Sequence, residues 1–280
     1  SDARLPAVSA IFTPHTELSD MQLIEPERGC HRGCTFCVMR RSTNGGMRWI
    51  DPMRVLDAIA EDATKVGLVG AAVTDHPKIM DILRALIDER GLRVGISSLR
   101  ADRLTDEFVA LLVRGGYRSM TVAIDGPSSR MAKAIEKGLD WSDIERAAVL
   151  AARHRMHHIK IYCVVWLPGE TDEDRDELVL RTRAIAQILP VVLGVSPFVP
   201  KWRTPLARAP FCGEARAKEI LATLRARLPR EIELRGPSAR EAYTEYRLAR
   251  GGTELAESIV AVSRAGGRLS SWRNELARVP

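Results

Sequence analysis

The sequence has 280 residues, of which 45% are hydrophobic and 28% charged, with a formal net charge of +6 at pH 7. The chain is therefore long and apolar enough to bury a large core, while no run approaches the roughly 18 apolar residues that span a bilayer. No apolar signal-peptide segment follows the N-terminal Ser1–Arg4, so we expect a protein of the cytoplasm without membrane association.

Residues 1–20 lack a regular hydrophobic pattern and are expected to form an irregular lead. From residue 21 to about 210, short apolar runs alternate with longer helix-like segments. The runs predict six strands, at residues 21–26, 67–73, 93–98, 118–125, 158–167 and 191–198. Helices are predicted between them, at residues 51–66, 77–90, 105–114, 128–135, 142–154 and 172–189.

Repeated strand–helix units with near-continuous apolar strands predict a parallel sheet that is covered on both faces. An open doubly wound sheet and a partial barrel both fit this pattern. In either fold, reactive residues are expected at the carboxyl ends of the strands. Residues 211–280 form a mostly helical extension in this prediction, with helices at 213–228, 239–250, 254–264 and 270–278.

Residues 30–37, with the sequence CHRGCTFC, place Cys30, Cys34 and Cys37 at a C-x3-C-x2-C spacing. On a helix this spacing would form a buried stripe of small hydrophobic residues. Gly29 and Gly33 argue against that interpretation, because each glycine costs about 1 kcal/mol inside a helix. Glycines instead suit a loop that wraps closely around a bound group.

A metal site is the other interpretation, either zinc with His31 as a further ligand or an iron–sulfur cluster. Structural zinc sites usually comprise two separated ligand pairs. The sequence has no second pair, so a cluster is favoured. A cluster normally takes four thiolates, and nothing recruits the distant Cys163 or Cys212. We therefore expect one iron to stay open for a substrate, with Cys163 in the core and Cys212 a weaker candidate for a ligand or radical relay.

The cysteine spacing after a first strand, with Phe36 before the last cysteine, resembles the radical S-adenosylmethionine (radical SAM) superfamily. The resemblance implies an α/β fold, with a partial (β/α)6 barrel over residues 21–210. It also implies a [4Fe–4S] cluster held by the three cysteines, whose open iron binds S-adenosylmethionine (SAM). One electron from the cluster then breaks a C–S bond of SAM, commonly giving a 5′-deoxyadenosyl radical.

Within that resemblance, the ends of the second and third strands supply candidates for SAM binding. Thr74 and Asp75 lie where the family often carries a Gly-Gly-Glu-like stretch, although Asp75 would alternatively cap the helix that starts near residue 77. Ser97 and Ser98 suit the ribose hydroxyls or the carboxylate of SAM. Arg100 suits the carboxylate, unless its loop faces solvent.

The later strands add candidates from two further resemblances. Residues 166–171, WLPGET, resemble a Gly-Leu-Pro-Gly-Glu-Thr segment that packs beside adenine, which implicates Trp166 and Glu170. Residues 197–206, PFVPKWRTPL, resemble a segment of cobalamin-type and methylthiotransferase-like radical enzymes, which implicates Pro197. Trp202 and Arg203 become substrate-binding candidates for an anionic or aromatic substrate if they face the barrel mouth. No individual catalytic residue is predicted.

The resemblance predicts an enzyme with a small-molecule or peptide substrate and a reductant such as flavodoxin or ferredoxin. Cobalamin-dependent methyl transfer is the first hypothesis, although the domain that usually binds cobalamin is not found in this sequence. The alternatives are a tRNA methylthiotransferase-like enzyme and a non-enzymatic iron–sulfur protein for electron transfer or redox sensing. A nucleic-acid partner is not favoured, because 35 of the 42 basic residues are Arg and they are spread evenly along the chain.

Overall fold

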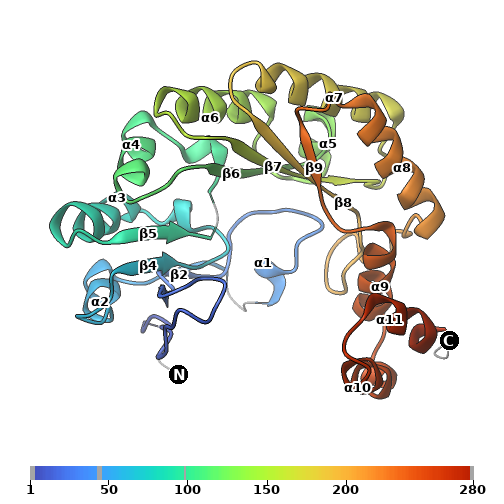
Figure 1. Cartoon of the computed structure of the whole chain (residues 1–280), viewed down its shortest axis with the longest axis horizontal. Coiled ribbons are helices and arrows are strands. Elements are labelled where there is room, and N and C mark those ends of the chain that lie inside the picture. Colours follow the sequence, from blue (N-terminus) through green and yellow to red (C-terminus); the bar gives the residue numbers. More distant parts are fainter. Residues whose placement is uncertain (1–3, 43–45, 98, 278–280) are drawn as a thin grey trace.

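The computed structural model describes residues 4–42, 46–97 and 99–277. Seven parallel strands form an open arc in two sheets, with the strand orders β1-β4-β5 and β6-β7-β8-β9 (Figure 1). The strands are β1 (Gln22–Ile24), β4 (Lys65–Leu68), β5 (Arg93–Ile96), β6 (Met120–Asp125), β7 (Ile159–Val165), β8 (Val191–Pro197) and β9 (Glu233–Arg235). In the described part of the chain, β5 and β6 are neighbours in the arc without pairing to each other.

Helices cover the outer side of the arc, as expected when each parallel strand is joined to the next by a helical crossover (Figure 1). Those of the arc are α2 (Pro52–Asp57), α3 (Ile79–Arg84), α4 (Asp106–Arg114), α5 (Ser129–Ala134), α6 (Trp141–Arg153), α7 (Asp172–Ala186) and α8 (Glu214–Arg227). Short helical turns are η1 (Val73–Asp75), the π-helical η2 (Ala85–Glu89), η3 (Ala101–Arg103) and η4 (Thr253–Leu255). This architecture confirms the predicted α/β partial barrel.

The helix predicted at 51–66 is much shorter in the structure, and the following strand begins earlier than residue 67. Asp51 caps α2, and its carboxylate accepts a hydrogen bond from Met53 N at 2.9 Å. The helix ends at Asp57 because the buried side chain of Gln22, on β1, accepts a hydrogen bond from Ala60 N at 2.9 Å. The backbone N–H of Ala60 is therefore paired with a side chain 38 residues away, and not with a carbonyl of a longer helix.

Two strand pairings are absent from the sequence prediction. β9 pairs with β8, and its charged ends are typical of a sheet edge, which hides a short strand from a search for apolar runs. β2 (Glu27–Arg28) pairs antiparallel with β3 (Arg48–Trp49) and closes the base of the loop that carries the cysteines. The division of the chain at residue 210 stays a prediction.

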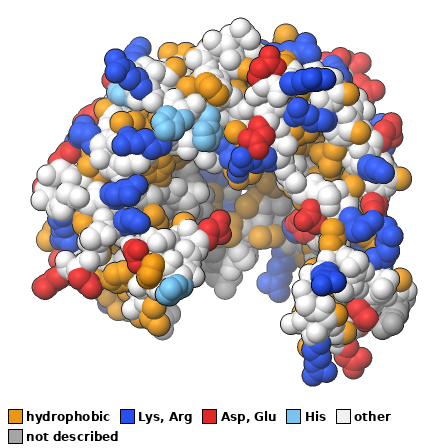
Figure 2. All heavy atoms as spheres, in the orientation of Figure 1, with side chains coloured by type: hydrophobic (Ala, Val, Ile, Leu, Met, Phe, Trp, Pro, Cys, Tyr) orange, Lys and Arg blue, Asp and Glu red, His pale blue; other side chains and the backbone are white. Residues whose placement is uncertain are grey.

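Over its described residues 211–277, the predicted extension contains four α-helices in the structure, of which α8 packs on the main core. α9 (Ala239–Arg250), α10 (Ala256–Arg264) and α11 (Leu269–Leu276) pack together at one end of the arc (Figure 1). Figure 2 shows the hollow that the arc encloses on its concave side. Among the described residues, no helix is both long and apolar enough to cross a membrane.

The largest group of buried side chains lies between the strands and the outer helices. A second, smaller core comprises Met131, Ile135, Leu167 and Phe198, and Phe36 of the cysteine loop packs against it. The cysteine loop is therefore anchored on the ends of β7 and β8 as well as on its own β2–β3 ribbon.

Candidate active site

The cysteine loop follows β2 and bends at Gly29, whose φ of 93° lies in the region that favours glycine. Cys37 N donates a hydrogen bond to Cys34 O at 3.3 Å, so the loop makes a tight turn between these two cysteines. Arg41, on α1 (Met39–Ser42), donates to the carbonyls of Cys34 and Cys37 at 3.2 and 3.0 Å. The loop therefore has a defined shape from its own hydrogen bonds.

All three predicted cysteines line a single cavity of about 300 Å³. The opposite walls come from the carboxyl ends of the strands, as expected for a parallel α/β fold. The lining residues are Cys30, Arg32, Cys34, Phe36, Cys37 and Met39 of the loop, Ala71 and Ala72 after β4, Ser97, Leu99 and Arg100 after β5, Thr121, Val122, Ala123 and Asp125 of β6, Lys137, and Tyr162 of β7.

The thiols sit in a setting that suits a metal cluster. Burial raises the pKa of Cys30 and of Cys34 above the usual value for a thiol, while Lys137 opposes the shift at Cys34. Binding of a metal ion reverses this preference, because the thiolate is the ligand form. Soft thiolates are the ligands of iron–sulfur clusters, and three of them leave one iron of a four-iron cluster without a cysteine ligand in this cavity.

No group of three or more His, Cys, Asp or Glu side chains converges on one metal ion in the described part of the chain. A cluster of several irons takes one thiolate per iron, so its ligands do not need to meet at a single point.

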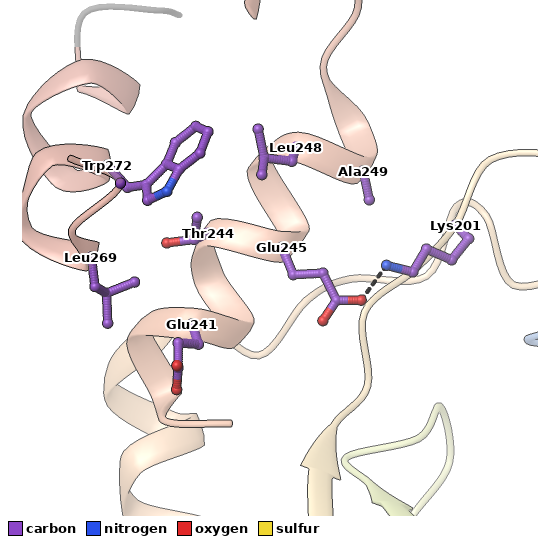
Figure 3. Close-up of a pocket in the computed structure, with 9 residues that line it drawn as sticks. Lys201, Glu241, Thr244, Glu245, Leu248, Ala249, Leu269 and Trp272 are labelled. Carbon is purple, nitrogen blue, oxygen red and sulfur yellow. Dashed lines mark hydrogen bonds and ion pairs between the residues drawn. The ribbon is translucent and has the colours of Figure 1, made fainter. Parts of the chain in front are cut away.

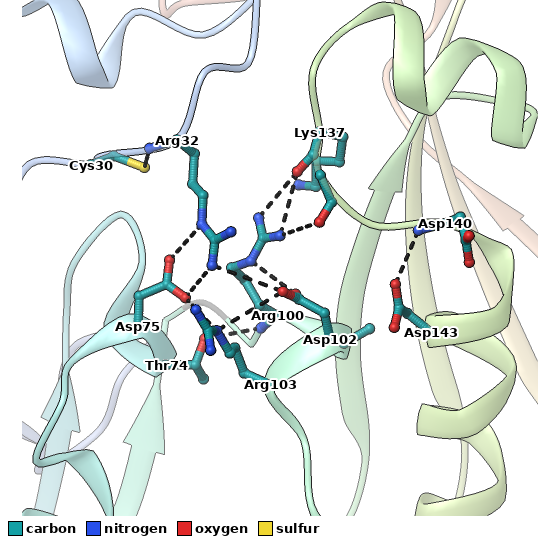
Figure 4. A network of polar contacts seen from close by, with 12 residues as sticks. Cys30, Arg32, Thr74, Asp75, Arg100, Asp102, Arg103, Lys137, Asp140 and Asp143 are labelled. Atoms are coloured by element: carbon teal, nitrogen blue, oxygen red, sulfur yellow. Dashed lines mark hydrogen bonds and ion pairs between the residues drawn. The ribbon is translucent and has the colours of Figure 1, made fainter.

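A network of charged side chains lies beside Cys30 (Figure 4). Arg32 donates to both carboxylate oxygens of Asp75, with Nε 2.8 Å from Oδ2 and Nη2 2.6 Å from Oδ1. Burial acts to raise the pKa of Asp75, but the hydrogen bonds and charge of Arg32 outweigh it, so the pKa lies below its usual value. α3 begins without any side-chain cap, so Asp75 does not have the capping role considered above.

The other candidates near Asp75 lie on or behind the cavity wall. Ser97 faces the cavity, and its hydroxyl bonds to the N and O atoms of Gly70 at 3.0 and 2.9 Å. Thr74 is buried behind the wall, where its hydroxyl accepts a hydrogen bond from Arg100 N at 3.2 Å. Ser98 lies outside the described residues.

Arg100 is buried and lines the cavity rather than facing solvent. Its guanidinium donates to Asp102 at 2.9 Å and to the carbonyl of Gly138 at 3.2 Å.

Of the candidates after β7 and β8, none lines the cavity. The Glu170 carboxylate is buried, accepts a hydrogen bond from Leu167 N at 2.9 Å and pairs with Arg175, so it closes the turn after β7. Trp166 adopts a φ of 63°, the conformation that the glycine of the similar segment would favour. Pro197 is buried as the last residue of β8. Their proposed roles in SAM binding stay predictions.

Trp202 and Arg203 also lie apart from the cysteine cavity, since neither lines it. The Trp202 indole donates to Arg250 O at 3.2 Å, and the Arg250 guanidinium stacks 3.7 Å from its ring centre. The adjacent Lys201 pairs with Glu245 at the edge of a second cavity of about 700 Å³ (Figure 3). This segment therefore ties α9 to the barrel, and its substrate role stays a prediction.

The cavity lining also includes residues that the sequence prediction did not name as site residues, among them Asp125, Lys137 and Tyr162. Asp125 and Lys137 form an ion pair at the cavity wall, and Asp125 adopts a φ of 58°. Lys137 lies in a stretch, residues 134–138, that resembles an Ile-x-Lys-Gly segment of the family, which was the available signal. Tyr162 faces the cavity and is 42% exposed; alternation along β7 puts Cys163 on the buried side.

The two remaining cysteines differ in their surroundings. Cys163 is 2% exposed in the core, as predicted, and burial raises the pKa of its thiol well above the usual value. Cys212 is partly buried and does not line the cysteine cavity.

Residues 24–181, more than half of the chain, match the family model of the Radical SAM superfamily. An uncharacterized protein of Methanocaldococcus jannaschii, MJ0966, is 33% identical over 192 residues, which cover 65% of this chain and 41% of that protein. The chain thus spans less than half the length of this curated relative.

Two solved structures have a similar fold. The chain superposes on methylornithine synthase (PylB) with a TM-score of 0.51 and 14% identity, covering 76% of this chain and 63% of that one. HydG, a maturase of the [FeFe]-hydrogenase, gives a TM-score of 0.50 and 12% identity, covering 76% and 51%. At these identities the likeness concerns the fold alone.

Proposed function

This chain belongs to the radical SAM superfamily, and from that membership we propose that it binds a [4Fe–4S] cluster and cleaves SAM reductively to begin radical chemistry. In this proposal Cys30, Cys34 and Cys37 each hold one iron, and the remaining iron is open for SAM. The observation that carries the proposal is that these three thiols line one cavity at the carboxyl ends of the strands.

The other cavity residues have distinct tasks in this proposal. The bound cluster supplies the single electron that breaks a C–S bond of SAM. Arg100 and Lys137 provide positive charge for the SAM carboxylate. The Ser97 oxygen, whose proton is donated to Gly70 O, keeps one lone pair that accepts a hydrogen bond from a ribose hydroxyl. Phe36 and Leu99 form apolar walls that exclude water from the reacting atoms.

We propose that the radical chemistry ends in group transfer to an unactivated carbon, with methyl transfer of the cobalamin type as the first hypothesis. The support is the segment 197–206, which carries that resemblance and also packs on the cysteine loop. Leu206 N donates to Thr35 O at 3.4 Å, and Phe198 belongs to the small core that Phe36 contacts. The same segment resembles the tRNA methylthiotransferase branch, which is the second hypothesis.

The decisive experiment is anaerobic reconstitution of the protein with iron and sulfide, followed by electron paramagnetic resonance of the reduced protein with and without SAM. We expect SAM to alter the spectrum, and dithionite with SAM to yield methionine and 5′-deoxyadenosine. Formation of S-adenosylhomocysteine would support methyl transfer. An unaltered spectrum and no SAM cleavage would contradict the proposal and favour an electron carrier or redox sensor. Cys34→Ser, which removes one ligand, is the matched negative control.

A further inference from the structure

The ion pair between Arg32 and Asp75 joins the cysteine loop to the end of a strand. We propose that this pair positions the loop and that its two charges set the reduction potential of the cluster in opposite senses. The inference rests on the proposed function, because it concerns a cluster held by the three cysteines. It assigns positioning roles to two residues that do not themselves bind iron.

The geometry of the pair is that of a strong anchor. Arg32 lies between Cys30 and Cys34 in the sequence, and its two nitrogens meet the two oxygens of Asp75 at 2.8 and 2.6 Å. The side chain of Asp75 is completely buried and that of Arg32 is 19% exposed. A buried bidentate pair fixes both the distance and the orientation of its partners. The backbone N of Arg32 also donates to the Cys30 sulfur at 3.4 Å, so the residue that the pair holds in place itself contacts a thiol.

The pair belongs to a chain of contacts that crosses the unpaired junction between β5 and β6. Asp75 also accepts from Arg103 Nε at 3.2 Å, and Arg32 lies 3.8 Å from Asp102. Asp102 in turn pairs with Arg100, which donates to the carbonyl of Gly138 beyond α5 (Figure 4). These side-chain contacts therefore connect the cysteine loop to the loop after β5 and to the loop after α5, across a junction where the described strands β5 and β6 are not paired.

Opposite charges beside the cluster predict opposite effects on its potential. Reduction adds one negative charge to the cluster, so a neighbouring guanidinium favours the reduced state and a neighbouring carboxylate opposes it. Arg32→Gln should therefore lower the potential, and Asp75→Asn should raise it. We expect each change to alter the ratio of reduced to oxidised cluster at a fixed potential by about tenfold, as for a unit charge roughly 10 Å away at an effective dielectric constant of about 20.

The test uses the reconstituted full chain without SAM, and measures iron content and the midpoint potential by redox titration followed by electron paramagnetic resonance. Arg114 and Asp88 provide the matched control, since they form the same bidentate pair at 3.0 and 2.9 Å on the exposed surface. Arg114→Gln and Asp88→Asn should leave the potential unchanged. The expected result is a fall for Arg32→Gln and a rise for Asp75→Asn.

A merely structural pair would behave differently, because both single substitutions would then loosen the loop and act in the same direction. Shifts of the same sign, or no shift with full iron content, would overturn the proposal. If Asp75→Asn fails to bind iron, the midpoint potential of Arg32→Lys tests the proposal in its place. This variant keeps the charge but not the bidentate geometry, so a potential near that of the unmodified protein supports the proposal, and a shift as large as that of Arg32→Gln overturns it.

The outcome separates this inference from the proposed function. A cluster whose potential shifts as expected but that does not cleave SAM would contradict the proposed activity and leave the roles of the pair standing. An unmodified chain that binds no iron would overturn both.

Discussion

Gly126 lies in the turn between β6 and α5, where the structure has no room for a side chain. A Cβ atom added there would lie 2.4 Å from Ala132 N and 2.8 Å from Met131 C, which are backbone atoms of α5. Backbone cannot rotate away as a flexible side chain can. Gly126→Ala should therefore push α5 away from the end of β6.

The displacement has a direct consequence for the candidate site. Asp125 ends β6 and Lys137 follows α5, so separating these elements breaks the ion pair on the cavity wall. Overpacking of this kind costs about 3 kcal/mol at the upper end of the usual range. For a chain of 280 residues, that loss lowers the melting temperature by about 5 °C.

The assay is urea unfolding of the cluster-free chain, together with iron content and SAM binding after reconstitution. Gly91→Ala is the matched control, because Gly91 has a φ of +67° and nothing within 4 Å of an added Cβ. Its cost, about 1 kcal/mol from backbone strain, should leave the cluster site unaltered. A Gly126→Ala variant as stable as Gly91→Ala, with normal SAM binding, would refute the packing argument.

Three further predictions concern single ionisable groups. After reconstitution, Cys34→Ser should lose most of the bound iron, whereas Cys212→Ser should retain it, as iron analysis would show. Asp174 has a pKa lowered to about 2, since hydrogen bonds from Arg130 and other donors outweigh its burial. Asp174→Asn should therefore cost about 1 to 2 kcal/mol at pH 7, and the difference should vanish as pH falls from about 4 to about 2, measured by urea unfolding. Burial raises the pKa of Glu27, whose Oε2 has no hydrogen-bond partner, so Glu27→Gln should remove a destabilisation that grows as pH rises above its usual pKa.

Each of these predictions has a clear contrary result. Full iron content in Cys34→Ser would remove this thiol from the ligand set. A pH-independent effect of Asp174→Asn would mean that its hydrogen bonds do not depend on charge. A Glu27→Gln chain whose stability falls with pH as steeply as that of the unmodified chain would assign the titration to another group.

Local signals in the sequence were enough to predict the repeating strand–helix order and the cysteine loop. Each depends on residues within a few positions of one another, such as the glycines beside the cysteines and the Thr105 hydroxyl that accepts a hydrogen bond from Phe108 N at the start of α4. The cysteine spacing, the apolar runs and the family resemblance all depend on short stretches of sequence.

Tertiary contacts decided which of the candidate side chains share a cavity. Asp75 forms an ion pair with Arg32, 43 residues earlier in the sequence. Gln22 accepts the hydrogen bond from Ala60 N, 38 residues later, where α2 has ended. Glu170 looked equally polar in sequence, yet the turn after β7 buries it against Arg175. The physical reason is that a hydrogen bond or ion pair forms wherever the fold brings donor and acceptor together. The positions of two residues in the sequence do not indicate whether the fold brings them into contact.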